Sequence, residues 1–158
     1  MRYVSASFTT HLQATELYLA VCLKITPRAG AVRYFTDWSG DLVVGWQTYR
    51  STIGVKYYTL EDNAGFDTGQ WAVEGLISAD SFSLDEIESQ VGFLGGASVE
   101  LFAVNPNDLT MGTWPLKYGR LVRVLPKGEG YSLECETLDA ILSRTPLRSE
   151  ERRVGKEC

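Results

Sequence analysis

The chain has 158 residues, with 15 Lys and Arg, 20 Asp and Glu and one His, so its formal net charge is −5 at pH 7. Hydrophobic residues make up 44% and charged residues 22%, a composition that supports a packed core and argues against intrinsic disorder. The acidic balance without Lys/Arg blocks excludes a typical nucleic-acid-binding surface, and no stretch approaches the roughly 20 apolar residues of a membrane span.

The first predicted elements are a short helix and a strand. Residues 7–14 are expected to be helical, because Phe8 and Leu12 are four positions apart and share one helix face. Residues 17–25 carry apolar side chains at every second position, which predicts a strand with one buried side.

Turn residues divide the next part of the chain into further strands. Pro27 fixes φ and Gly30 tolerates positive φ, so residues 27–30 predict a turn. A tight hairpin is predicted about Gly45 and Trp46. The strands expected between these turns and beyond them cover residues 32–36, 42–44, 47–50, 56–61 and 70–77.

The pattern becomes helical at residues 81–91, where Ser83 followed by Glu86 is a capping-box signature. Strands are then predicted at residues 98–104, 114–125 and 131–137, a hairpin turn at 126–130, and a last helix at 138–143. These elements predict an α+β, β-rich fold: an antiparallel barrel-like or sandwich sheet with two or three short helices.

The last eleven residues, 148–158, are matched codon by codon by a common short-read sequencing adapter, so we interpret them as a translated adapter. Removing their four basic and three acidic residues leaves 11 Lys and Arg and 17 Asp and Glu, a net charge of −6. We therefore expect residues 1–147 to form the domain, as part of a truncated gene product, and residues 148–158 to pack against nothing.

Few residues could carry chemistry, and each has a structural explanation. His11, the single histidine, is expected to be exposed on the first helix with no nucleophile or acid near it in sequence. Asp37, Ser39 and Asp41 imitate the start of a calcium loop, but the loop lacks its Gly and its final Glu, which predicts a turn. The motifs G-x-S-x-G, H-E-x-x-H, C-x-x-C and the phosphate-binding loop are absent. We assign no catalytic, cofactor-binding or metal-binding residue and predict that the chain is not an enzyme.

The cysteine, glutamate and tryptophan residues also have structural explanations. Cys22 and Cys135 lie in apolar alternating stretches, which favours buried thiols over a disulfide. Glu134 and Glu136 share one side of a strand and could do acid–base work, but alternating Glu is typical of a solvated face. The tryptophans are scattered, which favours core or interface packing over a sugar-binding shelf; they are Trp38, Trp46, Trp71 and Trp114.

Several stretches in the same order carry a resemblance to one family. They include SASFTTHLQ at residues 5–13, LYLAVCLKIT at 17–26, RAG at 28–30, FTD at 35–37, DL at 41–42, YR at 49–50, VEGL at 73–76, VELFAVN at 99–105 and GTWPLKYGRL at 112–121. Over residues 4–145 the chain resembles the N-terminal part of the tail-tip or baseplate hub proteins of tailed phages, prophages and gene transfer agents. These are relatives of the tail-tip protein L of lambda-like phages.

The resemblance implies a structural virion component, made in the cytoplasm of a bacterial host. It implies a homotrimeric ring that closes the distal end of the tail tube. The implied partners are the distal tail ring and tail-fibre or receptor-binding proteins. Members of the family carry four cysteines downstream that are thought to hold an iron–sulfur cluster. Neither Cys22 nor Cys135 matches those positions, so we expect no cofactor in this chain.

The sequence features agree with a part used in assembly. A β-rich domain with many aromatic residues and no catalytic motif suits complementary packing around a symmetry axis. We expect exposed strand edges, such as residues 114–125, to pair with neighbouring subunits.

Two alternatives stay open at this point. A carbohydrate- or receptor-binding module of the tail tip would use the tryptophans, and Trp38→Ala or Trp114→Ala would then abolish glycan binding. A tail-associated cell-wall hydrolase would be active on peptidoglycan.

Overall fold

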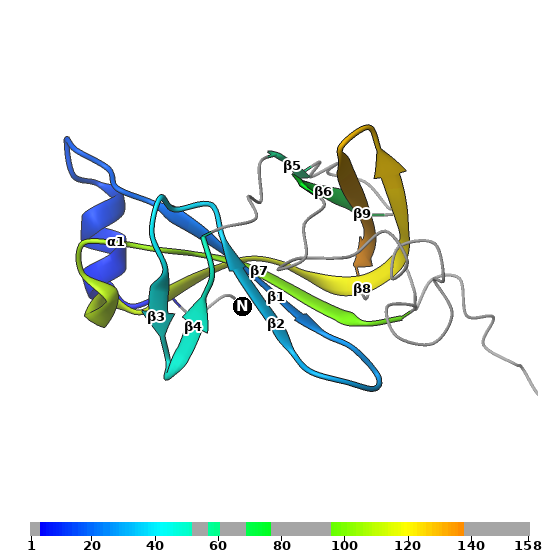
Figure 1. The fold of residues 1–158 in the computed structure, drawn as a ribbon. Helices are drawn as coiled ribbons and strands as arrows, with labels where there is room; N and C mark the ends of the chain where they lie inside the picture. The colour runs from blue at the N-terminus through cyan, green and yellow to red at the C-terminus, as the bar shows by residue number, and fades with distance from the viewer. Residues whose placement is uncertain (1–3, 52–56, 61–68, 77–95, 138–158) are drawn as a thin grey trace, which may run out of the picture.

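The computed structural model describes residues 4–51, 57–60, 69–76 and 96–137. In these ranges seven strands form one antiparallel sheet, in the order β2-β1-β7-β8-β9-β6-β5, and two strands form a separate hairpin (Figure 1). The elements are α1 (Ala6–Leu12), β1 (Ala20–Thr26), β2 (Arg33–Thr36), β3 (Leu42–Val44), β4 (Gln47–Tyr49), β5 (Tyr57–Leu60), β6 (Gln70–Leu76), β7 (Ser98–Val104), the 3-10 helix η1 (Leu109–Met111), β8 (Thr113–Lys127) and β9 (Gly130–Thr137). The predicted helices at 81–91 and 138–143 and the tail at 148–158 lie outside the described residues.

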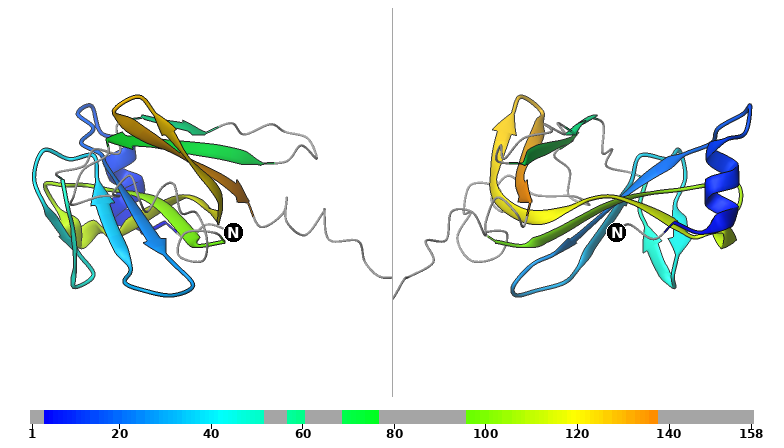
Figure 2. Two further views of the ribbon diagram at one scale, coloured as in Figure 1. Left: turned by 45° about the vertical axis from the view of Figure 1, so that its right-hand side comes forward. Right: turned by 180° about the vertical axis from the view of Figure 1, so that it is seen from behind.

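The long strand β8 joins the two halves of the sheet. Its first part pairs with β7 and its second part with β9, and Figures 1 and 2 show it bending between them. The register of β8 against β9 shifts between Leu121 and Arg123, so Val122 is an extra residue, and it is exposed. Gly119 and Leu121 are buried two positions apart, but the next buried residue is Val124, three positions further on. A bulge of this kind bends and twists a strand, which accounts for the curl of the sheet.

Gly119 allows β8 and β9 to approach closely beside this bulge. A Cβ placed at Gly119 would lie 2.2 Å from the carbonyl oxygen of Glu136. No real side chain fits at that distance, so a glycine is required where the sheet curls.

The main hydrophobic cluster fills the inner side of the curl. Its buried residues come from β1, β2, β6, β7, β8, β9 and the residue just before β7, and they are Val21, Leu23, Ile25, Phe35, Trp71, Val73, Ala97, Val99, Leu101, Leu121, Val124, Tyr131, Leu133 and Cys135. This arrangement confirms a β-rich antiparallel fold, and a curled half-barrel describes it better than a sandwich of two packed sheets.

A second cluster lies on the opposite face, under the β3–β4 hairpin. Its buried members are Ala20, Cys22, Leu42, Tyr49 and Val104. Strand β1 is therefore buried on both faces between Ala20 and Leu23. The prediction of one buried side was wrong, because the hairpin covers the face that alternation alone assigns to solvent.

The β3–β4 hairpin turns through Gly45 and Trp46, as predicted. Both residues have positive φ, 56° and 70°, the backbone of a two-residue hairpin turn that matches the twist of its strands. Gly45 adopts this conformation freely, whereas an L side chain such as that of Trp46 costs about 1–2 kcal/mol there. Leu42 pairs with Tyr49, and both are buried against the sheet.

Helix α1 closes one end of the sheet. Ser5 caps it, with its Oγ accepting a hydrogen bond from the Phe8 N–H at 3.1 Å and donating one to the carbonyl oxygen of Met111. Phe8 is fully buried, and its ring lies 6.4 Å from that of Trp114. The predicted helix is thus confirmed, within two residues of its expected bounds.

Two other expectations need correction. The strand expected at 17–25 begins at Ala20, and Leu17 before it is exposed. The turn expected at 126–130 is shorter, because β8 continues to Lys127 and β9 begins at Gly130. Strand β8 lies between β7 and β9 in the sheet, but residues 113–118 pair only with β7 and residues 121–127 only with β9, so the pairing of its open edges with neighbouring subunits stays a prediction. One α-helix and one 3-10 helix are seen in the described residues, where two or three helices were expected for the whole chain.

Candidate functional site

The residues that could imitate a catalytic or metal site hold turns and helices in place. His11 is half-buried rather than exposed, and its Nε2 lies 3.0 Å from the carbonyl oxygen of Tyr18. Asp37 Oδ1 accepts a hydrogen bond from the Val21 N–H at 2.7 Å. Asp41 Oδ1 accepts hydrogen bonds from the backbone and side chain of Ser51. The described residues contain no group of three or more potential metal ligands, and none of their helices is long and apolar enough to cross a membrane.

The two described cysteines are buried thiols, as predicted. Cys22 belongs to the second cluster and Cys135 to the main cluster, on opposite faces of the sheet. Burial raises the pKa of the Cys22 thiol to about 12, although its hydrogen bond to Thr36 works against that rise. Burial also raises the pKa of the Cys135 thiol. These thiols do not fit an iron–sulfur cluster, whose ligands must converge as thiolates.

The two glutamates beside Cys135 differ from each other. Glu134 forms an ion pair with Arg123, with Oε1 3.2 Å from Nη2, on the exposed face. Glu136 is only 8% exposed, so the solvated face predicted for both residues was wrong for this one. Strands β6 and β8 flank it on both sides, with Gln70 and Arg120 directly opposite.

The tryptophans do not share a face. Trp71 is buried in the main cluster, Trp38 packs against the second cluster, and Trp114 lies beside Phe8. Trp46 is 97% exposed at the hairpin turn. Packing in the core was therefore the correct interpretation for three of them, and no sugar-binding shelf forms.

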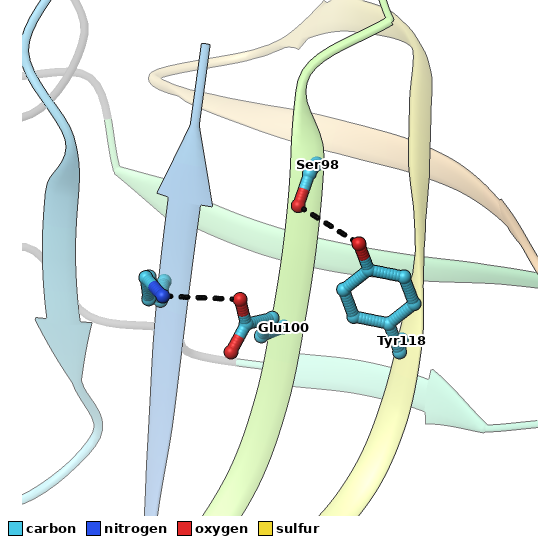
Figure 3. Close-up of polar contacts among 4 residues, drawn as sticks. Ser98, Glu100 and Tyr118 are labelled. Carbon is cyan, nitrogen blue, oxygen red and sulfur yellow. Dashed lines mark hydrogen bonds and ion pairs between the residues drawn. The ribbon is translucent and has the colours of Figure 1, made fainter.

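Two pairs of polar side chains lie on the outer face of β1, β7 and β8. Lys24 is directly opposite Glu100, and Glu100 is directly opposite Tyr118. Lys24 Nζ lies 3.1 Å from Glu100 Oε1. Figure 3 shows the Ser98 hydroxyl directed at the Tyr118 hydroxyl, and the two oxygens are 3.4 Å apart. We call Lys24, Ser98, Glu100 and Tyr118 the outer strip.

Strand alternation explains the position of the outer strip. Every second residue of β1 and β7 faces this side, and the apolar ones lie under the β3–β4 hairpin. The polar ones continue past the hairpin, where Lys24 and Glu100 are 31% and 38% exposed and Tyr118 is 48% exposed. The sequence did not reveal this strip, because it depends on pairing β1 with β7, which are far apart in the chain. The polar and aromatic side chains are typical of a surface that contacts another protein.

Comparison with known proteins adds two findings. The sequence matches the family model described as "Baseplate hub protein, N-terminal attachment domain" over residues 5–153. A solved chain in the virion of a native gene transfer agent particle has a similar fold, with a TM-score of 0.76 and 23% sequence identity. That alignment covers 88% of this chain and 47% of the other, so this chain spans about half the length of that neighbour. Comparison with curated proteins gave no match.

Proposed function

Since this chain belongs to the family of baseplate hub N-terminal attachment domains and is thus a structural part of a virion tail, we propose that it helps to close the distal end of the tail tube. In this proposal it does so as part of a homotrimeric hub ring, which also organises assembly of the tail tip. The family match over residues 5–153 carries the proposal.

The ring would place this domain beside the distal tail ring and the tail-fibre or receptor-binding proteins. The outer strip is the surface best suited to such a contact. Tyr118 offers a large aromatic side chain with a hydroxyl, and the opposite charges of Lys24 and Glu100 leave the strip electrically neutral. Contact through side chains would use the outer face of β8 and leave its pairing with β7 and β9 unchanged.

No observation in the described part of the chain favours a hydrolase. Burial raises the pKa of Cys22 and Cys135, so both thiols stay protonated and are poor nucleophiles. His11 already contacts the Tyr18 carbonyl. A glycan-binding module is not favoured either, because the tryptophans do not line up on one face.

The proposal is tested by deleting the gene and complementing the deletion. We expect particles without the protein to have open, non-infective tails, seen by electron microscopy and a transfer or plaque assay. Wild-type protein should restore both properties. Closed and infective tails in the deletion strain would overturn the proposal.

The outer strip is tested in the same complementation assay. Lys24→Glu places two like charges directly opposite each other, and we expect incorporation into particles to fall about tenfold, equivalent to about 1.4 kcal/mol. In the double variant Lys24→Glu with Glu100→Lys, the ion pair forms again inside the domain. Each of the two charges that a partner would meet then has the opposite sign. The thermal stability of the double variant should therefore recover while its incorporation does not. Recovery of both would show that the strip matters only for folding.

A further inference from the structure

The tip of the β3–β4 hairpin presents an exposed apolar surface. Trp46 is 97% exposed, and Val43 on the preceding strand is 58% exposed. Val43 pairs with Thr48 on the hairpin face that points away from the sheet, since the neighbouring pair, Leu42 and Tyr49, is buried. We call Val43, Gly45, Trp46 and Thr48 the hairpin tip.

The fold does not explain a tryptophan at this position. Its side chain joins neither hydrophobic cluster, whereas the other three tryptophans pack against buried residues. Its φ of 70° is one that glycine adopts without strain and a bulky side chain adopts at a cost. A strained residue that adds no packing within the domain points to a role outside it.

Contacts at the base of the hairpin also fix its position on the sheet. Tyr49 anchors the hairpin in an aromatic group, with its ring 5.1 Å from that of Tyr34 and 5.5 Å from that of Phe102. Just after β4, the Arg50 N–H donates to the Tyr34 carbonyl oxygen, and the Arg50 carbonyl oxygen accepts from the Thr36 N–H. These contacts tie the end of β4 to the sheet, and Leu42 at the start of β3 is buried against it, so the base of the hairpin is fixed before Trp46 binds a partner.

We infer that Trp46 inserts into an uncharged, apolar pocket on another tail protein, with a hydrogen-bond acceptor for its indole N–H. This inference rests on the proposed function and names the chemistry of one of its partners. Tryptophan is among the residues that most often dominate the energy of a protein contact, and its N–H is usually satisfied when buried.

The charges of the chain favour such a pocket over a membrane. Residues 42–49 contain no charged side chain, and the whole chain carries a net charge of −5. Anionic lipid surfaces attract clusters of Lys and Arg, which the tip lacks. An uncharged pocket is the complementary surface for an uncharged tip.

The small size of the tip argues against self-association of two copies tip to tip. One Trp and one Val supply far less than the roughly 800 Å² per partner of a standard interface. A flat self-association through these side chains would therefore be weak.

The test uses the full chain labelled with 5-fluorotryptophan and observed by fluorine NMR. The spectrum of Trp46→Gly identifies the Trp46 resonance. The labelled chain is titrated with each purified structural protein encoded by the neighbouring tail genes, with phosphatidylcholine vesicles and with unlabelled chain. We expect one tail protein to shift the Trp46 resonance, and Trp46→Gly to weaken that binding by about tenfold or more. Val122→Ser, which changes another exposed apolar residue, should bind as the wild type does.

Other outcomes separate the inference from the function it rests on. Undiminished binding of a tail protein by Trp46→Gly overturns the role of Trp46 and leaves the proposed function standing. A Trp46 resonance that moves only with vesicles or only with unlabelled chain also overturns the inference. If the wild-type chain binds none of the tail proteins, the proposed function fails, and the inference fails with it.

Discussion

At the scale of single residues, Gly119 shows how a missing side chain permits a close approach of two strands. Alanine there would bring Cβ within 2.2 Å of the Glu136 carbonyl oxygen, and backbone atoms cannot move aside cheaply. We expect Gly119→Ala to lower the free energy of unfolding by about 1–3 kcal/mol or more. Gly40→Ala is the control, because no atom lies within 4 Å of its added Cβ and its effect should stay within about 0.5 kcal/mol. Urea denaturation measures both, and equal midpoints for the two variants would contradict this account.

Sequence patterns predicted some residue environments and missed others. The buried thiols of Cys22 and Cys135 followed from apolar alternation alone. The burial of Glu136 did not, because it depends on tertiary packing that alternation does not specify: Glu134 lies between the same two strands, and its side chain is 37% exposed. The outer strip was missed for the same reason, since Lys24 and Glu100 meet only once β1 pairs with β7.

At the scale of elements, the N-cap residue of α1 also contacts a part of the chain that is distant in sequence. Ser5 Oγ bonds to the Phe8 N–H and also to the Met111 carbonyl oxygen just before β8. We expect Ser5→Ala to lower the free energy of unfolding by about 1 kcal/mol, within a range of about 0.5–2. Thr10→Ala removes only an exposed bond back to the Ala6 carbonyl oxygen and should change it by less than about 0.5 kcal/mol. Thermal unfolding distinguishes the two, and a neutral Ser5→Ala would show that water replaces the cap fully.

Hairpins were predictable and the order of strands was not. The β1–β2, β3–β4 and β8–β9 hairpins follow from turn residues and alternation within short stretches. The β1–β7 and β6–β9 pairs join segments that are far apart in the chain, and no local pattern specifies them. This explains why the sequence did not place β8 between β7 and β9.

At the scale of the whole molecule, stability should fall in alkali. Burial is the main cause of a raised pKa at four groups: Cys22, Tyr49, Tyr131 and Cys135. In the folded state each of these groups keeps its proton. In the unfolded state it has its ordinary pKa, in the range of about 8.5–10, and releases its proton there. The unfolded state then binds fewer protons, so the stabilisation is complete below that range and is lost as the pH rises through it.

Guanidinium denaturation at a series of pH values between about 7.5 and 10.5 measures this loss. We expect the free energy of unfolding to decrease steadily above about pH 8.5. The double variant Cys22→Ala with Cys135→Ala is less stable at neutral pH, but its decrease with pH should be shallower. A wild-type profile that stays flat over this range would contradict the burial of these groups.

The central strands of the sheet are also the last of its strands to be synthesised. β7, β8 and β9 follow one another directly, while β1–β2 and β5–β6 are attached on either side of them. At about 5–20 residues per second, the N-terminal hairpin leaves the ribosome several seconds before β7 is made. Its apolar strand β1 has no partner for its second edge during that time. We expect the domain to fold only after residue 137 has emerged, so the nascent chain depends on protection from aggregation and proteolysis until then.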